Sequence, residues 1–307
     1  MKSVAGVIAL VVAGGLAELL VGPAGFGWPE DPFIAWQLRF PRLLLALGAG
    51  AGLAACGLLL QVLLRNPLAS PYTLGVGSAS ALGASIVMIA LPAWSVGLGA
   101  WLGALIATGL VLALRRRAGL DNEALVLCGI AIALCASAGV LLLHYLADRA
   151  TSAAMLRWTM GGLSSVGLAD GLWGIVPTII GSLWLLWMIP KLNLLQLGED
   201  WSESRGVSVE PLKMTILIVV ALWTGSLVAQ AGPISFVGLI APHMARRSFG
   251  FDLRRNAPAT LAIGAGLLAC CDAAARVALA PAELPVGVLT ALLGGPAFLG
   301  LLLARRR

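Results

Sequence analysis

Apolar runs of about 20 residues, separated by short segments rich in Pro, Gly and charged residues, make up most of this sequence. A run of that length can cross the hydrocarbon core of a bilayer as a helix. Only 11% of the 307 residues are charged, whereas a soluble domain has about a quarter. A chain with so few charged residues cannot cover a water-facing surface of normal polarity. The sequence therefore predicts an all-α polytopic membrane protein.

Ten spans are predicted within a single transmembrane domain, 1–307, when turn residues are taken as boundaries. The run 232–246 is short for a full crossing, and the polar segment 147–169 is expected to be a surface loop or a short interfacial helix. The first run has no convincing cleavage site, which favours a span over a signal peptide. The ten runs are 4–22, 41–64, 71–91, 95–114, 122–146, 170–190, 211–231, 232–246, 256–280 and 284–304.

The basic residues predict the orientation of these spans. Most of the 20 Lys and Arg fall on the side that holds both termini, while Arg39, Arg42, Arg149, Arg157 and Arg276 fall on the other side. Cytoplasmic loops are enriched in Lys and Arg, so both termini are expected in the cytoplasm. The net charge of +6 is thus explained by topology, and nucleic acid is not an expected partner.

Small residues dominate the segment 74–85, which contains Ser78, Ser80 and Ser85 among Gly and Ala. Small side chains let membrane helices pack closely. They could equally line a wide path, because a Ser hydroxyl can bond to the carbonyl four residues earlier and tolerate both dry and wet surroundings. Both interpretations stay open at this point.

Catalytic and cofactor motifs are missing from the sequence. The three lysines, Lys2, Lys191 and Lys213, lack the preceding Gly of a P-loop. His144 and His243 are the only histidines, and the five cysteines lie in apolar runs without a CxxC pair. We therefore expect no enzyme activity, no metal site and no cofactor in this chain.

Two carboxylates bear on how transport would be driven. A transporter driven by protons or sodium needs ionisable residues at mid-membrane depth. Glu18 and Asp272 are the only candidates, and both fall near the outer ends of their spans. We expect Glu18 to reach the membrane interface, so an ion-coupled secondary transporter is the less favoured alternative.

Four separated motifs carry a family resemblance. The first is "RFPRLLLALGAGAGLAACGLLLQVLLRNPLASPYTLGVGSASALGAS". It is followed by "LNLLQLGEDWSESRGV", "GPISFVGLIAPHMARR" and the C-terminal stretch that begins "LLACCDAAARVALAPAELPVGV". In this order they resemble the signatures of the FecCD/cobalamin-type permeases, the membrane subunits of ABC importers for iron–siderophores, haem and cobalamin.

The resemblance implies a type II ABC importer permease fold, with about ten transmembrane helices per subunit in a bacterial inner membrane. It implies a homodimer, two cytoplasmic ATPase subunits that bind ATP and Mg, and a periplasmic or lipid-anchored binding protein. The expected cargo is a ferric siderophore, with haem or cobalamin as the alternative.

The resemblance also assigns roles to residues. Arg39, Arg42 and Arg276 match outer arginines that dock the binding protein, and Arg forks pair well with carboxylates. The family's path and inner gate correspond to Gly75, Ser78, Ser80 and Leu82. Contacts with the ATPase are expected from Glu199, Arg205, Gly206, Pro242, His243 and Arg246.

Overall fold

Helices form nearly all of the regular structure in the computed structural model, which describes residues 4–22, 25–119, 122–164, 167–280 and 282–304. The α-helices are α1 (Val4–Leu20), α2 (Phe40–Leu63), α3 (Val76–Ala90), α4 (Val96–Ala118), α5 (Asn122–Leu146), α6 (Arg149–Thr159), α7 (Leu168–Leu197), α8 (Glu199–Ser204), α9 (Val209–Ala231), α10 (Val237–Phe249), α11 (Leu253–Ala278) and α12 (Val286–Ala304). The strands β1 (Val21–Gly22) and β2 (Gly25–Phe26) form a short antiparallel pair after α1.

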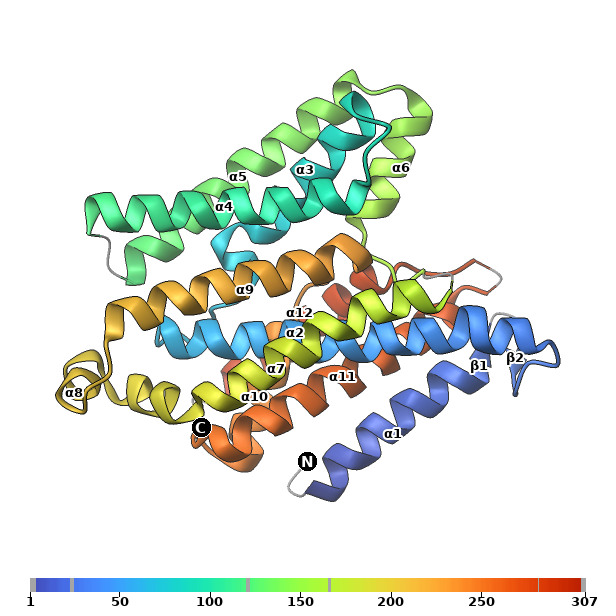
Figure 1. Ribbon diagram of the computed structural model, residues 1–307. Helices are drawn as coiled ribbons and strands as arrows, with labels where there is room; N and C mark the ends of the chain where they lie inside the picture. The colour runs from blue at the N-terminus through green and yellow to red at the C-terminus, as the bar shows by residue number, and fades with distance from the viewer. Residues whose placement is uncertain (1–3, 23–24, 120–121, 165–166, 281, 305–307) are drawn as a thin grey trace.

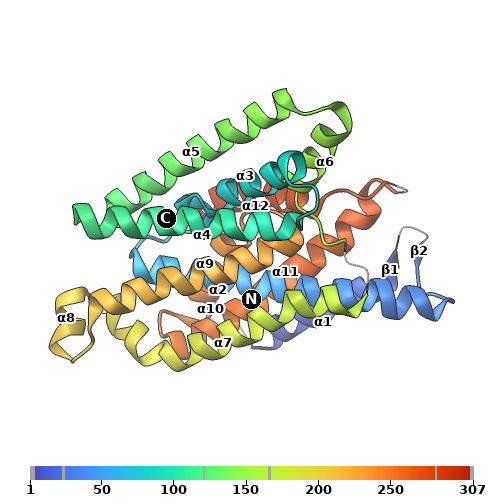
Figure 2. The same cartoon turned by 45° about the horizontal axis from the view of Figure 1, so that its top comes forward.

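The helices fall into two groups on either side of α2 and α9. Helices α3, α4, α5 and α6 lie on one side, and α1, α7, α10 and α11 lie on the other (Figures 1 and 2). Helix α9 packs against both α4 and α2, so it joins the two groups. Helix α2 is the most enclosed of the long apolar helices.

Glycines allow α2 to occupy this central position. Gly50 lies against the backbone of Gly264 in α11, and Gly57 lies against the backbone of Gly238 in α10. A Cβ at either position would overlap that backbone. The Gly-rich stretch of α2 therefore serves close helix packing, which stabilises membrane helices where the hydrophobic effect between them is weak.

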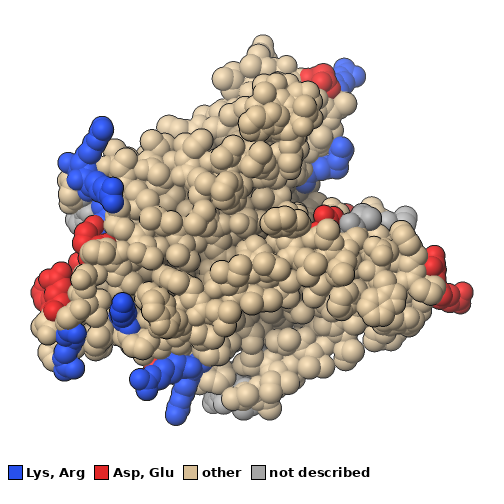
Figure 3. Space-filling view, in the orientation of Figure 1, with Lys and Arg blue, Asp and Glu red and all other residues tan. Residues whose placement is uncertain are grey.

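The predicted spans correspond to helices with shifted ends. Within the described residues, six helices are long and apolar enough to cross a membrane, three more are apolar but shorter, and α10 is shorter still. Helix α6 supplies the short helix expected within 147–169. In Figure 3 the charged side chains gather toward opposite ends of the molecule, with a broad uncharged surface between them.

Two of the larger differences between the helix boundaries and the sequence prediction have physical reasons. Helix α7 continues through Pro190 to Leu197, where the prediction ended at 190, because a helix can pass a Pro when neighbouring helices support it. Helix α10 begins at Val237 rather than at 232. Residues 232–236 are not helical, and Phe236 has a positive φ of 68°.

Candidate functional site

An ion-pair cluster joins α2 to α11 and to the residues before α12. The guanidinium of Arg42 donates from Nε to Oδ2 of Asp272 at 2.6 Å and from Nη2 to Oδ1 at 3.1 Å. Its third nitrogen, Nη1, donates to Glu283 at 2.9 Å. The cluster therefore holds Arg42 by all three nitrogens between a buried and a half-exposed carboxylate.

Arg276 extends this cluster to α1. Its side chain is only 3% exposed and pairs with the buried carboxylate of Glu18, with Asp272 3.6 Å away. It also donates to the carbonyl of Val21 at 2.9 Å. The expectation that Glu18 reaches the interface is wrong, because the neighbouring guanidinium lets this carboxylate stay buried.

Arg39 lies at the same end of the molecule, where it binds the turn after α1. Its Nη1 donates to the carbonyls of Leu19 and Gly27. The three predicted docking arginines thus share one end, but Arg276 faces inward and only Arg39 and Arg42 retain partial exposure. Their docking role stays a prediction.

Sequence reasoning overlooked the acidic half of this cluster as a structural unit. Asp272 and Arg276 are four residues apart, a spacing that places side chains on one face of a helix. That spacing was visible in the sequence. The pairing of Asp272 with Arg42, 230 positions earlier, depends on the packing of α2 against α11.

A cavity of about 480 Å³ opens between α3, α5, α6 and the segment before α10. Ser78 lines it and lies 3.3 Å from Ser137 of α5, as measured between their hydroxyl oxygens. Tyr72 forms part of its wall, and the backbone N–H of Ile234 donates to the Tyr72 hydroxyl at 2.6 Å. This bond ties the non-helical residues before α10 to the 3₁₀ turn Pro71–Leu74, which precedes α3.

The other predicted path residues lie outside this cavity. Gly75 has a φ of 77° and lies against the backbone of Gly129 in α5. Ser80 is fully buried, and Leu82 lines a separate apolar groove of about 240 Å³ between α3 and α4. The small residues of α3 therefore serve helix packing on some faces and line a cavity on one.

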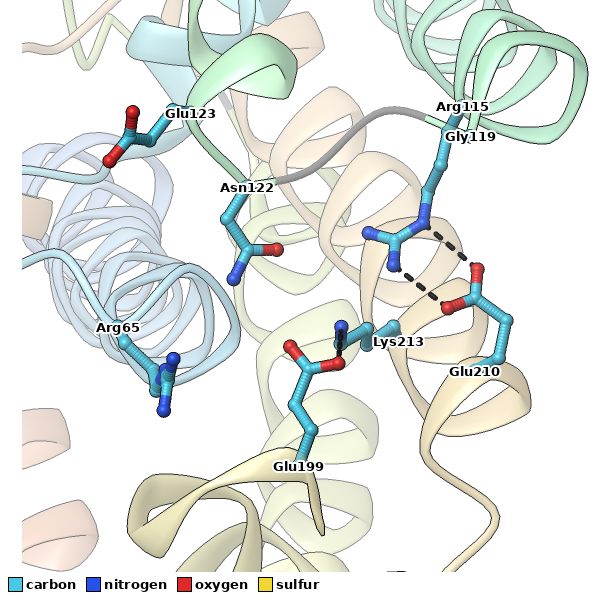
Figure 4. A pocket seen from close by; sticks show the side chains of 8 residues that line it. All are labelled: Arg65, Arg115, Gly119, Asn122, Glu123, Glu199, Glu210 and Lys213. Carbon is cyan, nitrogen blue, oxygen red and sulfur yellow. Dashed lines mark hydrogen bonds and ion pairs between the residues drawn. The ribbon is translucent and has the colours of Figure 1, made fainter.

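A second polar cavity, of about 520 Å³, lies at the end of the molecule that carries α8. Figure 4 shows the side chains that line it, contributed by α4, α5, α8, α9 and the end of α2. Glu199, the first residue of α8, forms an ion pair with Lys213 of α9. A predicted ATPase-coupling residue is thereby fixed to a membrane-spanning helix.

The remaining predicted coupling residues form two surfaces. Arg205 is exposed, with its guanidinium carbon 5.1 Å from the ring centre of Trp201, and Gly206 follows with a φ of 80°. In α10, Pro242 is buried while His243 and Arg246 are partly exposed. Helix α8 packs on α7 and α9, whereas α10 packs on α2, α11 and α12. Whether either surface contacts an ATPase stays a prediction.

The turn between α10 and α11 is fixed to the end of α7. The carboxylate of Asp252 accepts a hydrogen bond from the backbone N–H of Arg254 at 3.0 Å and from the amide of Asn193 at 2.8 Å. These donors lower the pKa of the Asp252 carboxyl, because they stabilise its charged form. The turn after α10 is therefore fixed to the end of α7.

Comparison with known proteins identifies the family. The FecCD transport family matches residues 4–305. The chain belongs to this family. It is 39% identical to the hemin transport system permease protein HmuU of Yersinia pestis over 88% of this chain and 83% of that protein. It is 34% identical to the vitamin B12 import system permease protein BtuC of Yersinia pseudotuberculosis over 97% of this chain and 91% of that protein.

Solved structures support the FecCD fold. A chain described as a metal-chelate type ABC transporter in an inward-facing conformation aligns with a TM-score of 0.89 and 32% identity, covering 97% of this chain and 98% of that one. PsaBC from Streptococcus pneumoniae aligns at 0.56 with 15% identity, covering 89% and 91%, and shows a shared fold. This FecCD protein is a multi-pass membrane protein with an ABC importer permease fold.

FecCD membership does not favour the ion-coupled alternative. The geometry agrees, since the two carboxylates that could have coupled ions, Glu18 and Asp272, are both paired with arginines.

Proposed function

We propose that this chain is the membrane-spanning permease of an ATP-driven importer for a bulky metal chelate, with a ferric siderophore as the first candidate. The observation that carries the proposal is the FecCD match over residues 4–305. A metal-chelate transporter and permeases named for hemin and vitamin B12 are among the similar proteins. Haem and cobalamin are therefore the competing cargos.

The cavity of about 480 Å³ lined by Ser78 and Ser137 is called the α3–α5 cavity below. Its chemistry favours a cargo whose metal already carries its own ligands. Small hydroxyl side chains line the cavity, among them Ser78, Ser137, Thr159 and Ser235. His144 also lines it, but its Nδ1 lies 2.8 Å from the hydroxyl of Ser152. Weak hydrogen-bonding groups let a coordinated metal pass, whereas a strong ligand set would retain it.

We infer a homodimer from the lining of this cavity and the surface of α5. Leu127, Leu134 and Leu141 recur every seventh residue along α5, so they share one face, and each is more than half exposed. A second copy of the chain would cover apolar side chains next to the cavity and enclose it. The complete importer would add two separate ATPase subunits that bind ATP and Mg.

The placement in a bacterial inner membrane follows from the same proposal. The α8 end would face the cytoplasm together with both termini, of which residues 1–3 and 305–307 lie outside the described part. The Arg42 cluster would face a binding protein on the outer side. Arg115, Arg116 and Arg117 end α4 at the α8 end, which agrees with this orientation.

The cargo is tested by an absorption spectrum of the complex isolated from its native membrane with its binding protein. A ferric-chelate charge-transfer band is expected. A Soret band would move the assignment to haem, and a corrin band would move it to cobalamin. If neither an ATPase nor a binding protein co-purifies under mild conditions, the permease proposal fails.

Bulk placed in the α3–α5 cavity should block transport. Ser78→Trp is expected to reduce cargo uptake at least tenfold in reconstituted importer while leaving the amount of folded permease unchanged, because the added indole fills cavity space. Ile106→Trp is the matched control, since Ile106 lines the separate apolar groove and is largely exposed. Equal loss in both variants would mean that the cavity is not the path.

Removing the exposed acid from the outer cluster should strengthen docking. Glu283 is 40% exposed and occupies one nitrogen of Arg42. An exposed ion pair contributes roughly 0.2–1 kcal/mol. Glu283→Gln should therefore raise the affinity for the binding protein by up to about fivefold, as measured by titration of the reconstituted permease. An unchanged or weaker affinity would show that Arg42 does not meet the binding protein's carboxylate.

A further inference from the structure

Two ion pairs meet at the first turns of α9. Glu210 and Lys213 lie three residues apart there, and each pairs with a different helix. Lys213 pairs with Glu199 of α8. Glu210 accepts two hydrogen bonds from Arg115 of α4, from Nε at 2.9 Å and from Nη2 at 2.8 Å. Figure 4 shows both pairs in the polar cavity. We call these four residues the α8–α9–α4 ion-pair chain.

The cations of this chain are buried and their partners are not. The side chain of Arg115 is 7% exposed and that of Lys213 is 5% exposed. The carboxylates of Glu210 and Glu199 are 61% and 38% exposed. Since a buried cation loses much solvation, neither cation can readily give up its carboxylate. Each pair therefore links two helices through a buried cation.

Helix α8 is a short helix with a glycine of positive φ on each side. Gly198 precedes it with a φ of 133° and Gly206 follows it with a φ of 80°. Its buried Ser202 donates to the carbonyl of Gly198 at 2.7 Å, which closes the first turn. Helix α8 is thus bounded by two glycines and attached to α9 through Glu199.

Packed helices connect α8 to the α3–α5 cavity. Helix α9 packs against α4, α4 packs against α3, and α3 carries Ser78 into the α3–α5 cavity. At the α8 end, however, space of about 520 Å³ separates the ends of α2, α4, α5 and α9. Arg115 of α4 and Glu210 of α9 both line this space, and their two hydrogen bonds link α4 to α9 there.

We propose that the α8–α9–α4 ion-pair chain transmits movement of α8 to the helices that line the α3–α5 cavity. Glu199, Lys213, Glu210 and Arg115 are positioning residues in this account. The inference rests on the proposed function and on the predicted contact of α8 with the ATPase. Movement of α8 would displace Lys213, and Glu210 on the same helix would displace Arg115 and α4.

Neutral variants of the two surface carboxylates test the proposal. Glu199→Gln, Glu210→Gln and the double variant are placed in the full importer with its ATPase subunits and binding protein in proteoliposomes. ATP hydrolysis and cargo uptake are measured together. We expect Glu210→Gln to keep ATP hydrolysis within twofold of the unmodified importer and to reduce uptake per ATP at least fivefold. Glu199→Gln should reduce uptake per ATP by a similar factor. The double variant should be no worse than either single variant, because both break the same chain.

The matched control is Glu123→Gln. Glu123 lines the same cavity from the first turn of α5 and forms no ion pair with the described residues. It should leave uptake per ATP unchanged. Should a Gln variant fail to assemble, Glu210→Asp keeps the charge but shortens its reach to Arg115, and it should show a smaller loss of coupling.

Three results would overturn the proposal. The first is unchanged uptake per ATP in both single variants. The second is a proportional loss of hydrolysis and uptake in Glu210→Gln, which would place this residue in ATPase assembly. The third is losses in the double variant that multiply, which would make the two pairs independent. Failure of the unmodified importer to take up cargo with ATP would instead refute the proposed function.

Discussion

Asp272→Ala is expected to lower the free energy of unfolding by about 3–5 kcal/mol, the range seen when one partner of a buried ion pair is removed. The Asp272 side chain is 1% exposed and accepts two hydrogen bonds from Arg42. It also lies 3.6 Å from Arg276. Its loss would leave Glu18 as the remaining buried carboxylate for two enclosed guanidinium groups.

Chemical denaturation in detergent micelles measures this effect, with Glu283→Gln as the control. Glu283 contacts the same arginine from a half-exposed position, so its neutralisation should cost at most about 1 kcal/mol. If the two substitutions cost the same, the cluster does not hold α2 against α11, and its carboxylates must be available for another role.

Gly57→Ala is expected to destabilise the protein by about 1–3 kcal/mol, although Ala is the better helix former. A Cβ at Gly57 would overlap the backbone of Gly238 in α10, and backbone cannot move aside as a flexible side chain can. Helices α2 and α10 would have to separate. The midpoint of thermal unfolding in micelles, followed by loss of the monodisperse elution peak, reports the change.

Gly109→Ala makes the same chemical change where it should do no harm. Gly109 is exposed in α4, and an added Cβ would have no neighbour within 4 Å among the described residues. The substitution should leave stability unchanged or raise it by up to about 1 kcal/mol. A larger loss at Gly109 than at Gly57 would contradict the packing assigned to α2.

The fold was accessible from the sequence because membrane spans are read from hydropathy over long windows. Helix ends were less accessible, since they depend on contacts: α7 passes Pro190, and α10 starts only after the turn at Phe236. Motif resemblance pointed to both charged ends of the molecule. It could not supply the partners of those motifs, because Arg42 and Asp272 meet through tertiary packing alone.

For the candidate site, too, some features could be predicted from the sequence and others could not. Composition left open whether the small residues of 74–85 serve packing or a path. The structure divides them by face: Ser78 lines a cavity, while Gly75 packs against α5 and Ser80 is buried. Arg115 and Glu210 had no motif to mark them. An Arg at the end of one helix and a Glu at the start of another are ordinary features until the helices are placed together.

ATP-dependent cargo uptake into proteoliposomes tests the central claim most directly. The permease is reconstituted with its ATPase subunits, and the binding protein is loaded with a ferric siderophore. Uptake should require ATP, stop on addition of vanadate and survive a protonophore. Uptake that proceeds without ATP and is abolished by the protonophore would contradict the account.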